Sequence, residues 1–279
     1  MKKLIYVFAL CSLIACQSNT KTDKTATATT NEDVIVQSQP KTARQYIEHA
    51  INAIGGSKAL YNKGTVTYDY EYRAPEGPNA ITLIGKETYM FEGERSYASF
   101  TTHSLTGANG KVVEGYDGKN AWVTFDGKVS DNEQANGVAR FLRKTNYYWF
   151  AMFYKLLDPG VNQEFLSDQT VNGKDCKRIK ITFGDDVGDG QDTYVIYVNK
   201  ETKLIEQFLF TIVGFGVTDP FLMTFDYETI EDIKIPTKRR YIESDWDGNI
   251  KGKNYYITNW TNIKFGVELD TSMFEKPLL

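Results

Sequence analysis

Histidine is nearly absent from this chain, which has only His49 and His103 among its 279 residues. A zinc site built on these two side chains would need further ligands, and no metal-binding motif supplies them. The sequence also has no Gly-x-Ser-x-Gly elbow, no Walker loop and no His-Glu-x-x-His motif. We therefore predict a protein that is not an enzyme and that uses no metal and no cofactor.

An excess of basic charge is absent too, because 32 lysines and arginines stand against 36 aspartates and glutamates. The formal net charge is -4 at pH 7. Nucleic-acid-binding proteins usually carry a basic patch, so this balance argues against a nucleic-acid partner. It also argues against purely electrostatic docking on anionic lipid.

Proline is scarce, with seven residues, whereas tyrosine and phenylalanine are abundant, with 18 and 16 residues. Aromatic side chains favour β-strands. Hydrophobic residues make up 41% of the chain, which is enough for a sizeable core. This composition predicts a wide, aromatic-rich sheet in preference to a bundle of helices.

Neither of the two main apolar runs reaches the roughly 20 residues that an ordinary membrane helix needs. The first run, residues 4–14, follows Lys2 and Lys3, a pattern typical of secretory signals. It ends in Leu13-Ile14-Ala15-Cys16, which resembles the lipobox of bacterial lipoproteins. The resemblance implies that residues 1–15 are a lipoprotein signal peptide. It also implies that Cys16 carries acyl chains such as palmitate, which anchor the protein in a membrane.

Residues 16–41 follow as a polar segment rich in serine, threonine, lysine, asparagine and glutamine. Such a composition cannot form a core, so we expect a flexible tether behind the lipidated cysteine. Cys11 leaves with the signal peptide and Cys16 carries lipid, so Cys176 has no disulfide partner. We predict that Cys176 is a small core residue on a strand.

Residues 42–279 read as a single domain. Thr42 and Gln45 match a capping box, and the helix that they begin should end at Gly55-Gly56. From Val66 to Tyr72, apolar and polar residues alternate, which indicates a half-buried strand. Similar segments separated by turn residues predict a mainly β (α+β) fold of about 11–12 antiparallel strands, at residues 64–73, 80–92, 94–105, 110–116, 119–125, 161–171, 174–183, 193–199, 203–214, 221–232, 237–246 and 251–262.

The second apolar run, residues 146–159, belongs to a helical insert expected at residues 132–157, with a break near Gly137. Wound as a helix, this run is apolar on every side and must be buried. We interpret it as a helix laid in the hollow of a curved sheet. Trp149 and Phe153 lie one turn apart on this helix, and the strand residues expected to face them are Tyr68, Tyr70, Phe210 and Phe225.

An apolar interior closed by a helix can hold an acyl chain, and it can equally be a filled core. The six aromatic residues just named are the candidate ligand-binding lining. The sequence leaves both alternatives open.

Residues 184–192 form an acidic, glycine-rich segment, GDDVGDGQD. Clustered carboxylates can bind calcium, but the spacing does not match an EF-hand loop and lacks its closing glutamate. We predict a solvated hairpin loop without a metal. A further alternative for the whole protein is an Asp-dependent hydrolase.

Several short motifs together resemble the outer-membrane lipoprotein-sorting superfamily, which includes LolA and LolB. They are Gly115-Tyr-Asp-Gly118 followed by Trp122, then Val171-Asn-Gly-Lys174, Ile235-Pro-Thr-Lys238 and Asp270-Thr-Ser-Met-Phe274. The resemblance is strongest to envelope lipoproteins of Bacteroidota type. It implies an unclosed, curved antiparallel half-barrel with helices on its concave side.

The resemblance also implies a function, namely non-catalytic binding of a lipid or of a lipoprotein acyl chain as a carrier or receptor. The expected location is the cell envelope, at the outer membrane facing the periplasm, with an envelope protein as a further partner. Phe215, flanked by Gly214 and Gly216, should be exposed at the sheet rim, and a similar loop in LolB-like proteins contacts membrane. The alternative function is an envelope scaffold or protein-interaction lipoprotein with a filled core and no small ligand.

Overall fold

The computed structural model describes residues 40–77, 80–107, 110–185, 187–188 and 190–278. The expected signal peptide, Cys16 and almost the whole expected tether lie outside these residues. Within them, one antiparallel sheet is built from β1 (Thr65–Arg73), β2 (Thr82–Met90), β3 (Arg95–His103), β4 (Val112–Tyr116), β5 (Ala121–Phe125), β6 (Lys128–Val129), β7 (Val161–Phe165), β8 (Gln169–Val171), β9 (Lys174–Phe183), β10 (Tyr194–Asn199), β11 (Ile205–Ile212), β12 (Val217–Ile230), β13 (Ile233–Glu243) and β14 (Tyr256–Phe265).

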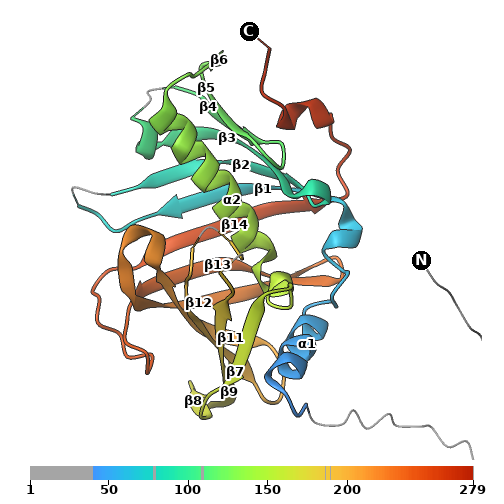
Figure 1. Cartoon of the computed structure of the whole chain (residues 1–279), viewed down its shortest axis with the longest axis vertical. Helices are drawn as coiled ribbons and strands as arrows, with labels where there is room; N and C mark the ends of the chain where they lie inside the picture. Colours follow the sequence, from blue (N-terminus) through green and yellow to red (C-terminus); the bar gives the residue numbers. More distant parts are fainter. Residues whose placement is uncertain (1–39, 78–79, 108–109, 186, 189, 279) are drawn as a thin grey trace, which may run out of the picture. The chain divides into compact units, whose positions relative to one another are not determined.

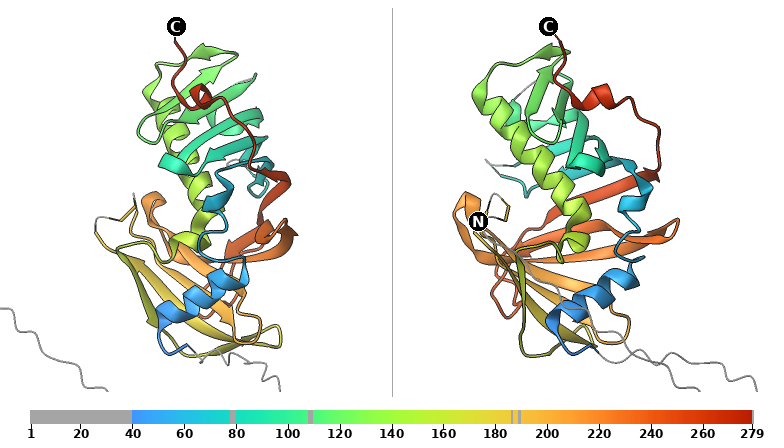
Figure 2. Two further views of the ribbon diagram at one scale, coloured as in Figure 1. Left: turned by 90° about the vertical axis from the view of Figure 1, so that its right-hand side faces the viewer. Right: turned by 45° about the vertical axis from the view of Figure 1, so that its right-hand side comes forward.

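The strand order is β6-β5-β4-β3-β2-β1-β14-β13-β12-β11-β10-β9-β7, with β8 paired to β9. The sheet curves but does not close into a barrel (Figures 1 and 2). Its edge strands β6 and β7 lie at opposite ends of the strand order and do not pair with each other. This confirms the predicted unclosed half-barrel. The described residues form 14 strands instead of 11–12, because β6 was not predicted and the expected strand at residues 161–171 divides into β7 and β8.

Helix α1 (Ala43–Ala53) begins with the predicted capping box. The Thr42 side chain accepts a hydrogen bond from the backbone amide of Gln45, and the Gln45 side chain accepts one from the amide of Thr42. Tyr46 then packs edge-on against Phe165 of β7, with ring centroids 5.6 Å apart. The helix therefore covers the β7 end of the sheet (Figure 1).

Helix α2 (Glu133–Lys155) lies across the inner face of the sheet (Figure 1). The Asn132 side chain caps it by accepting a hydrogen bond from the amide of Ala135. The helix runs without interruption through Gly137, so the predicted break is wrong. A glycine inside a helix costs only about 1 kcal/mol, which the packing of the helix on the sheet outweighs.

The core under α2 is aromatic. Phe150 stacks on Tyr68 of β1 with ring centroids 5.1 Å apart, and it lies 5.1 Å from Trp260 of β14. Strand β1 alternates as predicted, with Val66, Tyr68 and Tyr70 buried on the side of the helix. Cys176 is buried on β9, in a smaller cluster that includes Tyr197 and Leu209, as expected for a core residue.

Two of the family-like motifs meet in space. The indole Nε1 of Trp122 donates a 2.9 Å hydrogen bond to the carbonyl of Phe274, which belongs to the short helix η5 (Thr271–Phe274). Gly115 faces Trp122 so closely that a Cβ at this position would lie 2.3 Å from the indole ring. The glycine and the tryptophan therefore act together to fasten the C-terminal segment to β4 and β5.

Candidate ligand cavity under α2

A cavity of about 1280 Å³ lies between α2 and the inner face of the sheet. Its lining is mainly aromatic and aliphatic and comes from α2 and from strands across the middle and the β7 end of the sheet. We call it the α2 cavity. Sites for drug-sized ligands measure about 300–1,000 Å³, so the space is large enough for a ligand with long aliphatic chains.

Four of the six predicted lining residues border this cavity, namely Tyr68, Tyr70, Trp149 and Phe210. Trp149 is half-buried, and its ring lies 5.2 Å from Phe210 and 5.8 Å from Phe208. The α2 cavity therefore has an aromatic wall made by one helix and several strands.

Phe153 and Phe225 do not border the α2 cavity. Their rings pack against each other with centroids 5.6 Å apart, and Phe153 is only 6% exposed. Phe153 lies one helical turn after Trp149. Its side chain packs in the core, whereas that of Trp149 borders the cavity. The structure therefore corrects the expectation that these two residues line the ligand space.

Phe215 lies at the edge of the cavity, in the short helix η4 (Val213–Phe215), and 64% of it is exposed. Its ring meets Phe141 of α2 edge-on at 5.0 Å. Leu105 and Phe141 also border the cavity and are exposed. An exposed apolar rim thus lies on the cavity edge, and the predicted exposure of Phe215 is confirmed.

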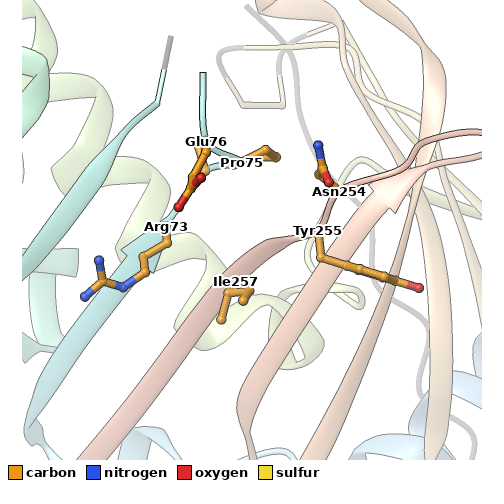
Figure 3. A pocket seen from close by; sticks show the side chains of 7 residues that line it. Arg73, Pro75, Glu76, Asn254, Tyr255 and Ile257 are labelled. Carbon is orange, nitrogen blue, oxygen red and sulfur yellow. The ribbon is translucent and has the colours of Figure 1, made fainter. Parts of the chain in front are cut away.

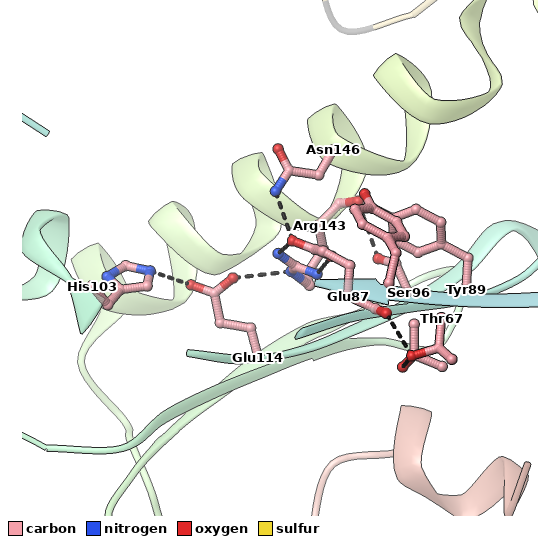
Figure 4. Close-up of polar contacts among 10 residues, drawn as sticks. Thr67, Glu87, Tyr89, Ser96, His103, Glu114, Arg143 and Asn146 are labelled. Carbon is pink, nitrogen blue, oxygen red and sulfur yellow. Dashed lines mark hydrogen bonds and ion pairs between the residues drawn. The ribbon is translucent and has the colours of Figure 1, made fainter. Parts of the chain in front are cut away.

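A polar network fastens α2 to the sheet (Figure 4). Arg143 donates to both carboxylate oxygens of Glu87 on β2, and its Nε donates to Glu114 on β4 at 3.0 Å. His103 lies 3.0 Å from the second oxygen of Glu114, and Asn146 donates to Glu87 at 2.8 Å. Burial lowers the pKa of Arg143, but the two carboxylates outweigh this effect and raise it overall. His103 is therefore tied into a structural network, in which its two ring nitrogens contact Glu114 and Thr106.

Arg239 is a charged side chain of the cavity that takes no part in this network. The guanidinium of Arg239 on β13 stacks on Trp260, with Cζ 4.0 Å from the ring centroid, and both residues border the cavity. Its Nε donates to the carbonyl of Pro236 at 3.1 Å. Burial lowers the pKa of Arg239 to about 9, so the side chain still carries its positive charge at neutral pH.

Residues 33–220 match the family described as "Family of unknown function (DUF6503)". The chain belongs to the DUF6503 family. No curated protein matches it.

Among solved structures, the DUF6503 chain is similar to three bacterial proteins. A LolA superfamily protein from Nitrosomonas europaea has 12% identity and a TM-score of 0.53, over 85% of this chain and 99% of that one. A putative outer membrane lipoprotein-sorting protein domain from Vibrio parahaemolyticus has 14% identity and a TM-score of 0.52, over 84% and 97%. A DUF1329 family protein from Desulfovibrio piger has 15% identity and a TM-score of 0.51, over 84% and 97%. The DUF6503 chain thus has the LolA-like fold that its motifs predicted.

A second, smaller pocket of about 580 Å³ lies at the outer ends of β1 and β14 (Figure 3). Arg73, Glu76, Asn254 and Tyr255 contribute polar groups to its wall, and Arg73 already pairs with Glu71 at 2.6 Å. This pocket of the DUF6503 chain offers less enclosed apolar surface than the α2 cavity.

The structure shows no metal cluster in the part of the DUF6503 chain that it describes. Of the acidic segment, Asp186 and Asp189 lie outside that part, and Asp192 accepts hydrogen bonds from Thr211 and from the amide of Val213. Among the described helices, none is long and apolar enough to cross a membrane.

Sequence reasoning missed the charged residues that face inward. Glu87 shares the inner face of β2 with Tyr89, and Arg239 lies between the exposed Lys238 and Arg240 on β13. In both strands, the alternation of apolar and polar residues places a charged residue on the apolar side. This position could have identified Glu87 and Arg239 as inward-facing from the sequence.

Proposed function

We propose that this protein binds a lipid or a lipoprotein acyl chain in the α2 cavity, as a non-catalytic carrier or receptor of the cell envelope. The observation that carries the proposal is the cavity itself. A mainly apolar space of about 1280 Å³ is maintained between α2 and the sheet instead of being filled by side chains. A scaffold protein has no need of such a space, because filling it would stabilise the fold.

The named relatives support the same class of ligand. Two proteins of similar fold are described as a LolA superfamily protein and as an outer membrane lipoprotein-sorting domain. In our proposal, Tyr68, Tyr70, Trp149 and Phe210 contact the aliphatic chain, because they form the aromatic wall of the cavity.

The proposed anchor is the acylated Cys16, which would hold the domain at the outer membrane facing the periplasm. Phe215 and Phe141 would then touch the membrane surface at the cavity edge and guide the chain inward. An envelope protein that delivers or receives the acyl chain would be the further partner.

Native mass spectrometry of the protein purified from its own envelope, followed by lipid extraction, tests the proposal. We expect a co-purified lipid, together with binding of a fluorescent fatty acid by the lipid-free protein. If the protein retains no lipid and binds no acyl probe, the scaffold alternative replaces the proposed function.

A further inference from the structure

The interior of the half-barrel contains a positive charge that no described carboxylate neutralises. Arg239 is only 5% exposed and forms no ion pair with a described carboxylate, and the titratable groups that act most strongly on it are the tyrosines Tyr68, Tyr70, Tyr89 and Tyr227. The other buried arginine of the interior, Arg143, has two carboxylate partners. A buried charge is costly unless it is paired, so the difference between the two arginines calls for an explanation.

A hydrogen-bond donor next to Arg239 lacks a protein partner. The indole Nε1 of Trp260 is buried and forms no hydrogen bond with any described residue. The Trp260 ring lies under the guanidinium, and both side chains border the α2 cavity. Buried donors are nearly always satisfied, so the unpartnered indole N–H beside a buried guanidinium that has no carboxylate partner indicates an acceptor that comes from outside the chain.

The position of these donors in the cavity identifies the kind of acceptor. The space beside them continues to the aromatic wall at Trp149 and Phe210, which suits aliphatic chains. A guanidinium binds carboxylate and phosphate oxygens through charge-assisted hydrogen bonds.

We propose that Arg239 and Trp260 form the head-group site of the α2 cavity, and that the ligand is an anionic amphiphile whose carboxylate or phosphate pairs with Arg239. This inference rests on the proposed function and specifies its ligand class. It places the charged head inside the half-barrel and the aliphatic chain along Trp149 and Phe210.

The test compares three amphiphiles with the same aliphatic chain, namely dodecanoate, dodecyl phosphate and 1-dodecanol, by competition against a fluorescent fatty acid. The lipid-free protein should bind the two anions about 10- to 100-fold more tightly than the alcohol, which is the factor expected for hydrogen bonds to a charged group. The ratio between the two anions then distinguishes a carboxylate from a phosphate head.

Arg239→Met should remove this preference, because it lowers the affinity for the two anions to about that for 1-dodecanol. The matched control is Arg240→Met, which removes the same charge from the exposed face of the same strand and should keep the preference. The melting temperature of Arg239→Met should not fall, because the variant loses an uncompensated buried charge.

Equal binding of all three amphiphiles by the parent protein would overturn the inference and leave the proposed function standing, and this comparison needs no variant. A preference that persists in Arg239→Met would overturn it as well. Absence of binding for all three would instead overturn the proposed function, and the inference with it.

Discussion

Arg143 of α2 pairs with Glu87 of β2 through both terminal guanidinium nitrogens, and both side chains are fully buried. The pair joins the central helix to a strand that lies 56 residues away in the sequence. Because the helix forms one wall of the α2 cavity, the same pair fixes the position of that wall.

Loss of Arg143 should therefore be costly. Arg143→Met leaves Glu87 and Glu114 buried without their cation, and we expect a loss of about 3–5 kcal/mol in the free energy of unfolding. Arg140→Met, on the exposed face of the same helix, should change it by less than about 0.5 kcal/mol. Denaturant unfolding of both variants measures the difference, and similar values for the two would contradict the proposed fastening role of the network.

Substitutions at Phe153 and Trp149 should have different effects, one mainly on stability and the other mainly on ligand affinity. Phe153→Ala opens a void in a packed region and should cost about 3–5 kcal/mol, without weakening the affinity of the folded protein for a fluorescent fatty acid. Trp149→Ala only enlarges the existing cavity, so it should cost less stability and lower that affinity. Thermal melts and probe titrations measure both effects, and the reverse result would show that Phe153 contacts the ligand.

The exposed Phe215 should contribute to membrane contact. Phe215→Glu should reduce binding of the domain without its lipid anchor to liposomes, because a charge replaces an apolar side chain at the cavity edge. Ile250→Glu is the control, since Ile250 is 51% exposed and does not border the cavity. Sedimentation with liposomes measures binding, and an unchanged Phe215→Glu variant would remove the membrane role.

The thiol of Cys176 should make the protein sensitive to alkali. Burial raises the pKa of this thiol to about 11 from an ordinary value of 9.0, so folding favours the neutral form. The resulting stability is complete below pH 9 and is lost as the pH rises toward 11. In a chain with Cys11 and Cys16 replaced by serine, Cys176→Ala should show a smaller alkaline loss of unfolding free energy. If the unfolding free energy falls equally steeply with pH in the parent and in the variant, the alkaline loss does not come from the Cys176 thiol.

Cys16 should be the lipidated residue. Cys16→Ser should leave an unprocessed or unanchored protein, because the lipid attachment and the signal cleavage both depend on this cysteine. Labelling with radioactive palmitate and membrane fractionation test this, with the unchanged Cys11 as an internal control. Persistent labelling of the variant would place the lipid elsewhere.

The sequence predicted the parts of the fold that depend on local pattern. The alternation around Tyr68, the capping box at Thr42 and the apolar run of α2 each reflect nearby residues, and each prediction is confirmed. The cavity could not be predicted in this way, because it depends on how side chains from distant strands meet. Phe153 and Trp149 are equally aromatic, and only the packing of the sheet against α2 places one in the core and the other on the cavity wall.

The pairing of β1 with β14 has a consequence for how the protein is made. These strands lie side by side in the middle of the sheet, although Tyr70 and Trp260 are far apart in the sequence. Until β14 takes its place, β1 and β13 both present unpaired edges to their surroundings. A chain in which β14 has not yet paired is therefore open to aggregation, and the sheet becomes continuous only when β14 joins β1 to β13.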